Sequence, residues 1–353
     1  MKQLIIEKQK IRNNISVTRE RTGGVPLCGV VKSDAYGLGL IQVVYVMKEE
    51  GIRFFAVSEP EDAAALRREG FTDEEILMLR SLSDPKEIEM LIDFNVIATV
   101  GSQESAMALS GIAERRSTVA EAHIKIDTGF GRYGFLPSET DKISSVIQYM
   151  QSLAVSGMYT HLNAYASSKE IARQLEAFQQ TLNTLHKKNL ETGLAHAVSS
   201  TALFNHKELP LFDMVRAGAS LYGHIDGKTG LSKVGIASAG IAETRWLPAG
   251  HCVSGGKKLK KPARIGIVPL GYADGFGLER PAKTRMHHLA RLLNPRSEAL
   301  NARLGNGDKL KVIGKPGQTH FAVDLTKSDV SVGEVVYSGI NPLFAARLPK
   351  TYI

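Results

Sequence analysis

Short apolar runs rich in β-branched residues alternate, from about residue 25 to residue 225, with longer stretches whose apolar positions recur at helical spacing. The stretches EPEDAAALRREG and ASSKEIARQLEAFQQTLNTLHKKN combine periodic apolar positions with charged faces, as the outer helices of a barrel do. Strands that alternate with helices run parallel, and eight of them close naturally into a barrel. The predicted strands are Leu27–Val31, Phe54–Val57, Ile76–Leu79, Val96–Val100, Ala122–Ile126, Ser156–Thr160, Ala195–Val198 and Met214–Ala217.

After about residue 225 the pattern changes to short β-type runs separated by Gly, Pro and Lys, such as ARIGIVPLGYADG and KLKVIGKPG. We therefore expect an α/β protein with an N-terminal (β/α)₈ TIM barrel in residues 1–225, followed by a mostly β C-terminal domain in residues 226–353. The basic segment Arg280–Leu304 has helical periodicity and departs from the β pattern. It is predicted to be a solvated insertion, with a contact surface for a subunit or an acidic partner as the alternative.

Composition narrows the classes of partner. The chain has 353 residues, 43% of them hydrophobic, with a formal charge of +8. Because the basic residues are mostly spread out, an anionic small molecule is favoured over nucleic acid. No run of 18 or more apolar residues occurs and the N-terminus MKQLIIEKQK is charged, so we expect a cytoplasmic protein without a membrane partner. Cys28 and Cys252 lack a CxxC partner, which predicts two buried thiols and no metal cluster.

Candidate chemistry lies where the predicted strands end, because residues beyond the carboxyl ends of barrel strands share one mouth. The first run ends at Lys32, within GVVKSDAYGLG. The other candidates at or just beyond strand ends are Tyr36, Lys125, Arg132, His161, Ser199, Ser200 and Arg216.

A lysine close to Arg132 and Arg216 in a desolvated mouth has its ammonium form disfavoured, which frees the amine of Lys32 to condense with a carbonyl. Serine hydroxyls and the Gly218–Ala219 backbone supply donors for a phosphate. Together these features point to a pyridoxal phosphate Schiff base. Taken singly, each has a plainer explanation: a surface lysine, serines that cap a helix, and a histidine satisfied in the core.

Five motifs, GVVKSDAYGLG, HIKIDTGFGRYGF, THLNAYA, DMVRAGASLYG and PLGYADG, occur in the order found in one family. In them the chain resembles the alanine racemase family of fold type III pyridoxal phosphate enzymes. The resemblance implies a barrel and a β domain, pyridoxal phosphate as cofactor, and a small amino acid as substrate. It also implies a head-to-tail homodimer whose active sites borrow residues from the partner.

By resemblance, Lys32 is the Schiff-base lysine and one of two acid/base groups, while Tyr272 is the second base, delivered by the partner subunit to the opposite face. Racemisation needs this arrangement because one group removes the α-proton and the other returns a proton to the other face. Tyr36 resembles the residue that hydrogen-bonds the cofactor phosphate. Ser200 resembles the phosphate-binding serine, and Ser199 stands where the family usually has asparagine.

The same resemblance gives Arg216 a place facing the pyridine nitrogen, where an arginine keeps its proton and weakens the ring as an electron sink. His161 resembles the histidine that supports Arg216 and the tyrosine network. Arg132 resembles the residue that helps to hold the substrate carboxylate. Lys125 resembles the lysine that is often carbamylated to steady that arginine.

The chain departs from the family in further places. It starts close to the first predicted helix, so we expect the family's leading strand to be missing. Gln318 and Thr319 replace a Met-Asp pair whose backbone helps to bind the substrate carboxylate, so Gln318 is a candidate substrate residue. The chain before RLPKTY is short, and Ala346 stands where some members have a tyrosine that crowds the pocket.

These features leave several functions open. An amino-acid racemase with alanine as default substrate comes first, and a racemase for serine, basic or a broad range of amino acids is the alternative. A pyridoxal phosphate-binding protein with little racemase activity is the alternative of another class. Tyr272 argues against that class, while the Gln318–Thr319 pair argues for it.

Overall fold

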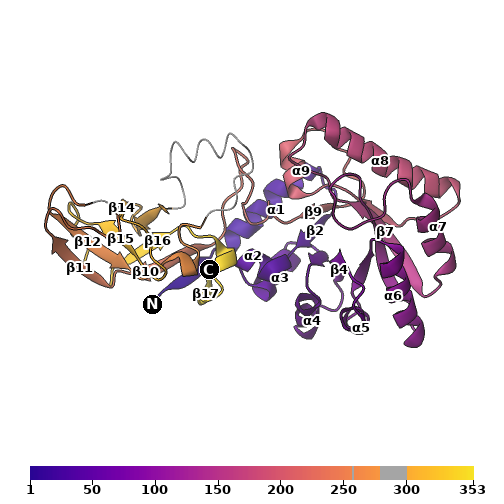
Figure 1. Ribbon diagram of the computed structural model, residues 1–353, viewed down its shortest axis with the longest axis horizontal. Coiled ribbons are helices and arrows are strands. Elements are labelled where there is room, and N and C mark those ends of the chain that lie inside the picture. Colours follow the sequence, from indigo (N-terminus) through magenta and orange to yellow (C-terminus); the bar gives the residue numbers. More distant parts are fainter. Residues whose placement is uncertain (257, 279–299) are drawn as a thin grey trace. The chain divides into compact units, whose positions relative to one another are not determined.

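The computed structural model describes residues 1–256, 258–278 and 300–353, and the chain forms two compact units in it (Figure 1). One unit comprises Lys10–Ala35 and Gly39–Lys233. The other comprises Met1–Gln9, Tyr36–Leu38 and Val234–Ile353. The prediction for the basic insertion falls mostly on residues 280–299, which lie outside the described residues.

The first unit is a barrel of parallel strands (Figure 1). Its hydrogen-bonded order runs β8-β7-β6-β5-β4-β3-β2-β9, and the Arg216 amide donates to the Val198 carbonyl at 3.0 Å where the last strand returns beside β8. This confirms the predicted barrel and its eight strands. They are β2 (Leu27–Val30), β3 (Phe54–Val57), β4 (Glu75–Ser81), β5 (Ile97–Val100), β6 (Ala120–Ile126), β7 (Leu153–Thr160), β8 (Leu194–His196) and β9 (Val215–Ala217).

Local signals start the barrel's helices. Asp84 accepts bonds from two amides at the start of α5, and Ser167 accepts one from Glu170 at the start of α8. Pro60 and Pro85 occupy first helical positions, where no amide hydrogen is needed. The helices are α1 (Lys8–Thr22), α2 (Lys32–Gly37), α3 (Leu40–Glu49), α4 (Pro60–Arg68), α5 (Pro85–Asp93), α6 (Gln103–Arg115), α7 (Thr140–Tyr149), α8 (Ser168–Lys187) and α9 (Ser200–Asn205).

The barrel interior is chemically divided. On the side of β2 to β5 and the start of β9, a cluster of buried apolar side chains fills it, and these are Cys28, Val30, Ala56, Leu77, Ile97 and Met214. On the side of β6 to β9 the buried side chains are instead polar, and they include His123, Lys125, Tyr159, His196 and Arg216. Such groups are buried only when they are paired, so the second half is where function is to be sought.

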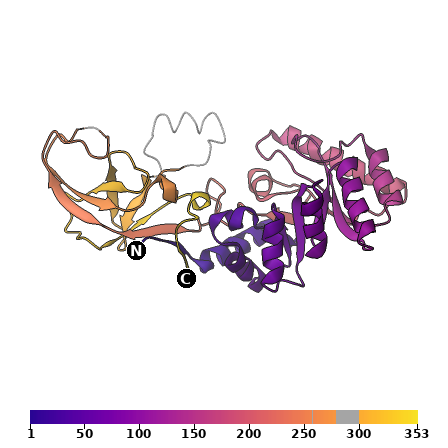
Figure 2. The ribbon, with the colours of Figure 1, turned by 60° about the horizontal axis from the view of Figure 1, so that its bottom comes forward.

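The second unit is built on a sheet of nine strands, which Figure 2 shows from a second direction. The order is β11-β12-β15-β14-β13-β16-β10-β1-β17, with antiparallel pairs throughout except β1 with β17. The strands are β1 (Gln3–Ile6), β10 (Ile236–Gly240), β11 (Glu243–Leu247), β12 (Ala263–Val268), β13 (Ala302–Leu304), β14 (Lys309–Ile313), β15 (Phe321–Asp324), β16 (Val335–Ser338) and β17 (Lys350–Tyr352). Short 3₁₀ turns, η1 (Tyr272–Asp274) and η3 (Pro342–Phe344), connect them.

Two expectations were wrong. The leading strand is present as β1, because Gln3–Ile6 pairs with β10 on one side and β17 on the other and buries Leu4 and Ile6. Cys252 is exposed rather than buried, since it lies in an isolated bridge with Lys258 outside the core strands; Cys28 is buried as predicted.

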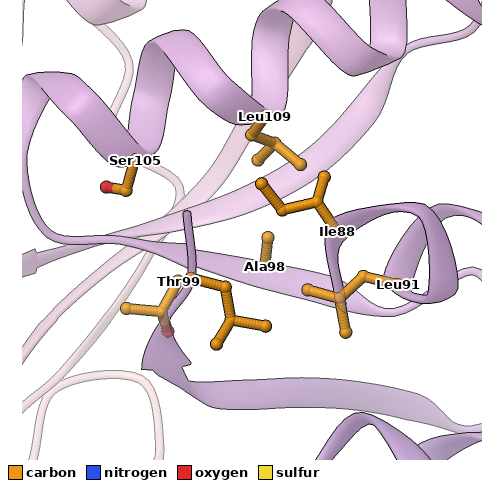
Figure 3. A pocket seen from close by; sticks show the side chains of 7 residues that line it. Ile88, Leu91, Ala98, Thr99, Ser105 and Leu109 are labelled. Carbon is orange, nitrogen blue, oxygen red and sulfur yellow. The ribbon is translucent and has the colours of Figure 1, made fainter. Parts of the chain in front are cut away.

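A small cavity lies between the barrel sheet and helices α5 and α6 (Figure 3). Its two hydroxyl groups are already engaged, since Thr99 Oγ1 donates to the Met78 carbonyl and Ser105 Oγ to the Ser102 carbonyl. It is therefore a packing gap rather than a binding site. The side chains that line it are Leu82, Ile88, Leu91, Ala98, Thr99, Ser105 and Leu109.

Among the described residues, no helix is both long and apolar enough to cross a membrane.

Gly157 on β7 gives a test of the polar half of the core. A methyl group added there would lie 2.5 Å from His123 Nε2, so Gly157→Ala should destabilise the barrel by about 1–3 kcal/mol through overpacking. Gly111, inside α6, has only the end of Arg115 near it, so Gly111→Ala should stabilise the protein by about 0.5–1 kcal/mol. Urea denaturation of both variants measures the change in unfolding free energy. If the two changes had the same sign, the packing described around Gly157 and Gly111 would be contradicted.

Candidate functional site

Arg216, on β9, carries a buried positive charge inside the barrel and is 3% exposed. Its Nη2 donates to the carbonyls of Thr160 at 2.6 Å and Ala197 at 3.3 Å, and its Nη1 donates to the carbonyl of His196 at 3.1 Å. The guanidinium also lies over the ring of Tyr159, 5.0 Å from its centroid. In the described part of the chain its partners are carbonyl dipoles, a histidine ring nitrogen and a π-face rather than a carboxylate.

Two histidines extend this network, and their hydrogen bonds assign their tautomers. Arg216 Nη1 lies 2.7 Å from His196 Nδ1, and because a guanidinium can only donate, this nitrogen must accept. The proton of His196 is then on Nε2, which lies 2.9 Å from His123 Nδ1, so His123 is protonated on Nε2 as well. Burial lowers the pKa of His196 strongly and that of His123 to about 4, and the charge of Arg216 acts in the same direction. Both rings are therefore neutral.

Four cationic side chains lie near enough to His161, which follows β7, for their charges to act on it. Burial and, to a smaller extent, nearby positive charges together lower the pKa of this histidine to about 3. Those charges belong to Arg216, Arg132, Lys125 and Lys32. The barrel therefore brings together, around one neutral imidazole, predicted residues from four separate strand ends.

The hydrogen bonds of Arg216 go to His196, Thr160 and Ala197, so support from His161 stays a prediction. The ring of His161 packs edge-on against Phe130, with centroids 4.8 Å apart. Sequence reasoning missed His196 and Tyr159. The available signal was a polar residue at an inward-facing position of a predicted strand.

The loop after β6 is fixed by Asp127 and Lys125. Oδ1 of Asp127 accepts bonds from the amides of Gly129, Phe130 and Gly131, and its Oδ2 accepts one from Arg132 at 2.9 Å. The buried Nζ of Lys125 donates to the carbonyls of Arg132 and Tyr133 at 3.0 and 2.8 Å. Burial lowers the pKa of Lys125 to about 8, and the charges of Arg216 and Arg132 act in the same direction while Asp127 opposes them.

Arg132 itself is exposed, and its guanidinium lies 4.8 Å from the centroid of the Phe130 ring. The Arg132 amide donates to Asp127 and its carbonyl accepts from Lys125, so the backbone that carries this side chain is held in place. That arrangement suits a group that binds an anionic ligand.

Hydroxyl groups gather where β8 and β9 end. Ser200 Oγ accepts a bond from the Gly218 amide at 2.9 Å and lies 3.0 Å from Ser220 Oγ. Ser199 forms a bridge with Arg216 and is the residue before α9. The structure thus places Ser199, Ser200, Gly218 and Ser220 close together. Ala219 follows directly in the chain, and the phosphate-binding role of this group stays a prediction.

The segment after Lys32, labelled α2, is a left-handed helical turn. Ser33, Asp34, Ala35 and Tyr36 have φ values of 55°, 54°, 50° and 60°. Each non-glycine residue in this region costs about 1–2 kcal/mol, and such strain clusters at functional sites. Hydrogen bonds that hold the turn include those from the Ala35 amide to the Val31 carbonyl at 2.9 Å, from the Gly39 amide to the Asp34 carbonyl at 3.0 Å and from the Leu40 amide to Asp34 Oδ1 at 2.7 Å.

Tyr272 and Gln318 lie together in the β unit. The amide of Tyr272 donates to the Gly317 carbonyl at 3.1 Å, and that of Ala273 to the Gln318 carbonyl at 3.0 Å. The side chain of Tyr272 is 47% exposed, and Gln318 is exposed too. The predicted second base and the predicted substrate residue are therefore presented side by side on one surface. Tyr36 also belongs to this unit, and its role stays a prediction.

Comparisons with known proteins agree on one family. The family model for the alanine racemase N-terminal domain matches residues 6–226. The alanine racemase of Clostridium novyi is 31% identical over 94% of this chain and 84% of that protein, and that of Halothermothrix orenii is 28% identical over 98% and 95%. The amino-acid racemase of Enterococcus faecalis is 32% identical over 77% of this chain and 40% of its own length. Among solved structures, the alanine racemase of Clostridium difficile 630 shares the fold, with a TM-score of 0.84 and 24% identity over 100% of this chain and 95% of that one.

The exposed Ser33 tests the strain after Lys32. Ser33→Gly should keep or raise the unfolding free energy, because glycine adopts positive φ freely, whereas Ser33→Val should lower it by about 1–2 kcal/mol. The same pair at Ser145, inside the right-handed helix α7, should reverse the order, since glycine is the poorer helix former. Urea titrations give all four values, and valine tolerated as well as glycine at position 33 would argue against a left-handed turn.

Lys125 makes stability depend on pH in a defined window. Its folded pKa of about 8 lies below the unfolded value, roughly 10.4, so between these values the unfolded state binds more protons and stability rises with pH. The unfolding free energy of the wild type minus that of Lys125→Met should therefore grow by roughly 3 kcal/mol from pH 8 to above pH 10. Denaturation in CO₂-free buffers measures the difference, and a flat profile would show that Lys125 is not desolvated.

Proposed function

Because this chain belongs to the alanine racemase family and is an amino-acid racemase, we propose that it uses pyridoxal phosphate, Lys32 and Tyr272 to interconvert the L- and D-forms of alanine. The observation that carries the proposal is the gathering of Lys32, Lys125, Arg132 and Arg216 around the neutral His161. An amine and three further cations at one barrel mouth suit an anionic substrate bound beside a carbonyl cofactor.

The chemistry of the donor set fits pyridoxal phosphate. Lys32 offers a primary amine for its aldehyde, and Ser199, Ser200 and Ser220 offer hydroxyl groups for its phosphate. Arg216 offers a hydrogen-bond donor for the ring nitrogen. When bound, the cofactor supplies an electron-withdrawing ring that acidifies the α-proton of the substrate.

The network behind Arg216 sets the character of that donor. His196 accepts from the guanidinium, and because burial lowers the pKa of this histidine strongly, it does not take a proton from Arg216. Arg216 therefore stays a donor that does not give up its proton. A ring nitrogen held by it remains unprotonated, which limits side reactions that need a stronger electron sink.

Two proton-transfer groups then work from opposite faces of the substrate. Lys32 holds or removes the α-proton on one face, and the phenol of Tyr272 does so on the other. The exposed position of Tyr272, beside Gln318, supports the idea that both residues serve a site completed by a second copy of the chain in a homodimer. Arg132, on its fixed loop, binds the substrate carboxylate, together with the Gln318 segment.

The small side chain of Ala346 favours amino acids larger than alanine as alternative substrates. It is exposed and small in the β unit, where some family members have a tyrosine that crowds the pocket. A site without that bulk would admit side chains larger than methyl, so serine, basic or several amino acids form the alternative. A cofactor-binding protein with little racemase activity is the alternative of another class.

Lys125 is proposed to carry a carbamate that steadies Arg132. With a pKa of about 8, its amine is partly unprotonated at neutral to slightly basic pH and can react with CO₂. The Nζ lies 3.0 Å from the backbone carbonyl of Arg132, which places the modification next to that residue.

Exchange of the α-proton in deuterated water tests the two-base proposal. With the cofactor-loaded protein and a panel of L- and D-amino acids, exchange with inversion should identify the substrate by NMR. Lys32→Ala should lose both the visible absorbance of the bound cofactor and exchange. Tyr272→Phe should keep the absorbance but slow exchange of one enantiomer by about 10²- to 10⁴-fold, leaving the other much less affected.

Tyr149→Phe, at the exposed end of α7, is the matched control and should behave as the wild type. Equal slowing of both enantiomers in Tyr272→Phe would remove Tyr272 from its role. A Lys32-dependent absorbance without exchange of any amino acid would favour the cofactor-binding alternative.

A further inference from the structure

A buried carboxylate lies directly behind the turn that carries Tyr272. Asp274 is two residues further along the chain and is 2% exposed. Its Oδ2 accepts a bond from the Gly271 amide at 3.1 Å, which joins the end of the turn η1 to the residue that precedes it. The carboxylate thus fixes both ends of the three-residue turn from its inner side.

The charge of Asp274 is balanced by a lysine from the other end of the sequence. Lys2 Nζ lies 2.7 Å from Oδ1 and 2.8 Å from Oδ2 of Asp274. Both oxygens are engaged by a single ammonium, so the pair has defined geometry rather than one loose contact. A buried carboxylate that lost this partner would be left uncompensated in a medium where charge is costly.

The strand β1 places Lys2 at this position. Gln3, Leu4 and Ile5 pair in register with β10, and Leu4 to Ile6 pair with β17, so the strand that directly follows Lys2 is held from both sides. The side chain of Lys2 is 36% exposed and that of Asp274 2% exposed, so the pair differs from an exposed surface pair through the burial of its carboxylate.

The turn in turn positions Tyr272 and the Gln318 segment. The amides of Tyr272 and Ala273 donate to the carbonyls of Gly317 and Gln318, and the Gly275 amide donates to the Tyr272 carbonyl at 3.1 Å. A shift of η1 therefore moves the phenol and its neighbouring segment together. A displacement of this kind reduces proton transfer steeply with distance.

We propose that Lys2 is a positioning residue for the reaction: by neutralising the buried Asp274 carboxylate it holds the turn that presents Tyr272. The proposal rests on the function of Tyr272 as a base. Lys2 acts through Asp274 and the turn η1, so its effect is confined to the face of the reaction that Tyr272 serves.

A positioning role and a general structural role of Lys2 differ in which enantiomer they affect: the first slows α-proton exchange of one enantiomer, and the second slows both. Lys2→Met should slow α-proton exchange at least tenfold for the same enantiomer that Tyr272→Phe slows, while exchange of the other enantiomer stays within about twofold of the wild type. Lys2→Arg keeps the positive charge and should therefore keep most of the wild-type exchange rate. Lys309→Met, which removes a lysine at an exposed position of β14 opposite Arg303, should leave both exchange rates unchanged.

A double variant keeps the test decisive if Lys2→Met loosens the β unit. Asp274→Asn removes the uncompensated charge yet keeps an oxygen to accept the Gly271 amide, so Lys2→Met/Asp274→Asn should recover both the thermal midpoint and the exchange rate relative to Lys2→Met alone. Recovery of the midpoint without recovery of the face-specific rate would overturn the proposal. So would equal slowing of both enantiomers in folded Lys2→Met.

The proposed function is tested first, in the same assay. If the cofactor-loaded wild type exchanges no amino acid, or Tyr272→Phe has no face preference, it is the two-base proposal that fails. If both behave as expected and Lys2→Met matches Lys309→Met, the role of Lys2 alone is rejected.

Discussion

The buried charge of Arg216 is the constraint around which the barrel interior is built. A guanidinium in a protein core needs a compensating group for each of its donors, and a carboxylate would be the usual one. Here the carbonyls of Thr160, His196 and Ala197, at the ends of β7 and β8, accept the hydrogen bonds of Arg216 instead. The π-face of Tyr159 lies beside them. Such neutral partners leave the positive charge undiminished, so it is available to whatever binds in front of it.

The same constraint accounts for the two halves of the barrel. Because Arg216 faces the interior from β9, the inward positions of β6, β7 and β8 nearest to it carry His123, Tyr159 and His196, which are hydrogen-bonded or stacked. The inward positions of β2 to β5 have no such charge to satisfy and are mostly apolar. The division of the barrel interior into a polar and an apolar half therefore follows from one requirement, the need to satisfy the charge of Arg216.

Sequence reasoning reached the strands of the barrel and the strand-end residues because both depend on local pattern and on one topological rule, that parallel strand ends share a mouth. It could not reach partners that are distant in sequence. Nothing near Lys2 indicates that it meets Asp274, and QLII between charged residues is too short to be recognised as β1. Cys252 was misplaced for a similar reason: a preference for burial describes cysteine on average and says nothing about a bridge outside the core strands.

The turn after Lys32 shows how strain is retained at such a site. Left-handed φ at Ser33 through Tyr36 is unfavourable for each residue, so a free peptide of this sequence would not keep it. On one side the Ala35 amide is bonded to the Val31 carbonyl at the end of the first barrel strand. On the other, Gly37 approaches Pro342 so closely that a β-carbon would lie 2.1 Å from its carbonyl oxygen, and the Leu38 carbonyl accepts the Tyr352 hydroxyl at 2.9 Å. The contacts on each side of the segment are therefore tertiary, and they keep Ser33 through Tyr36 in a conformation that the residues would not adopt alone.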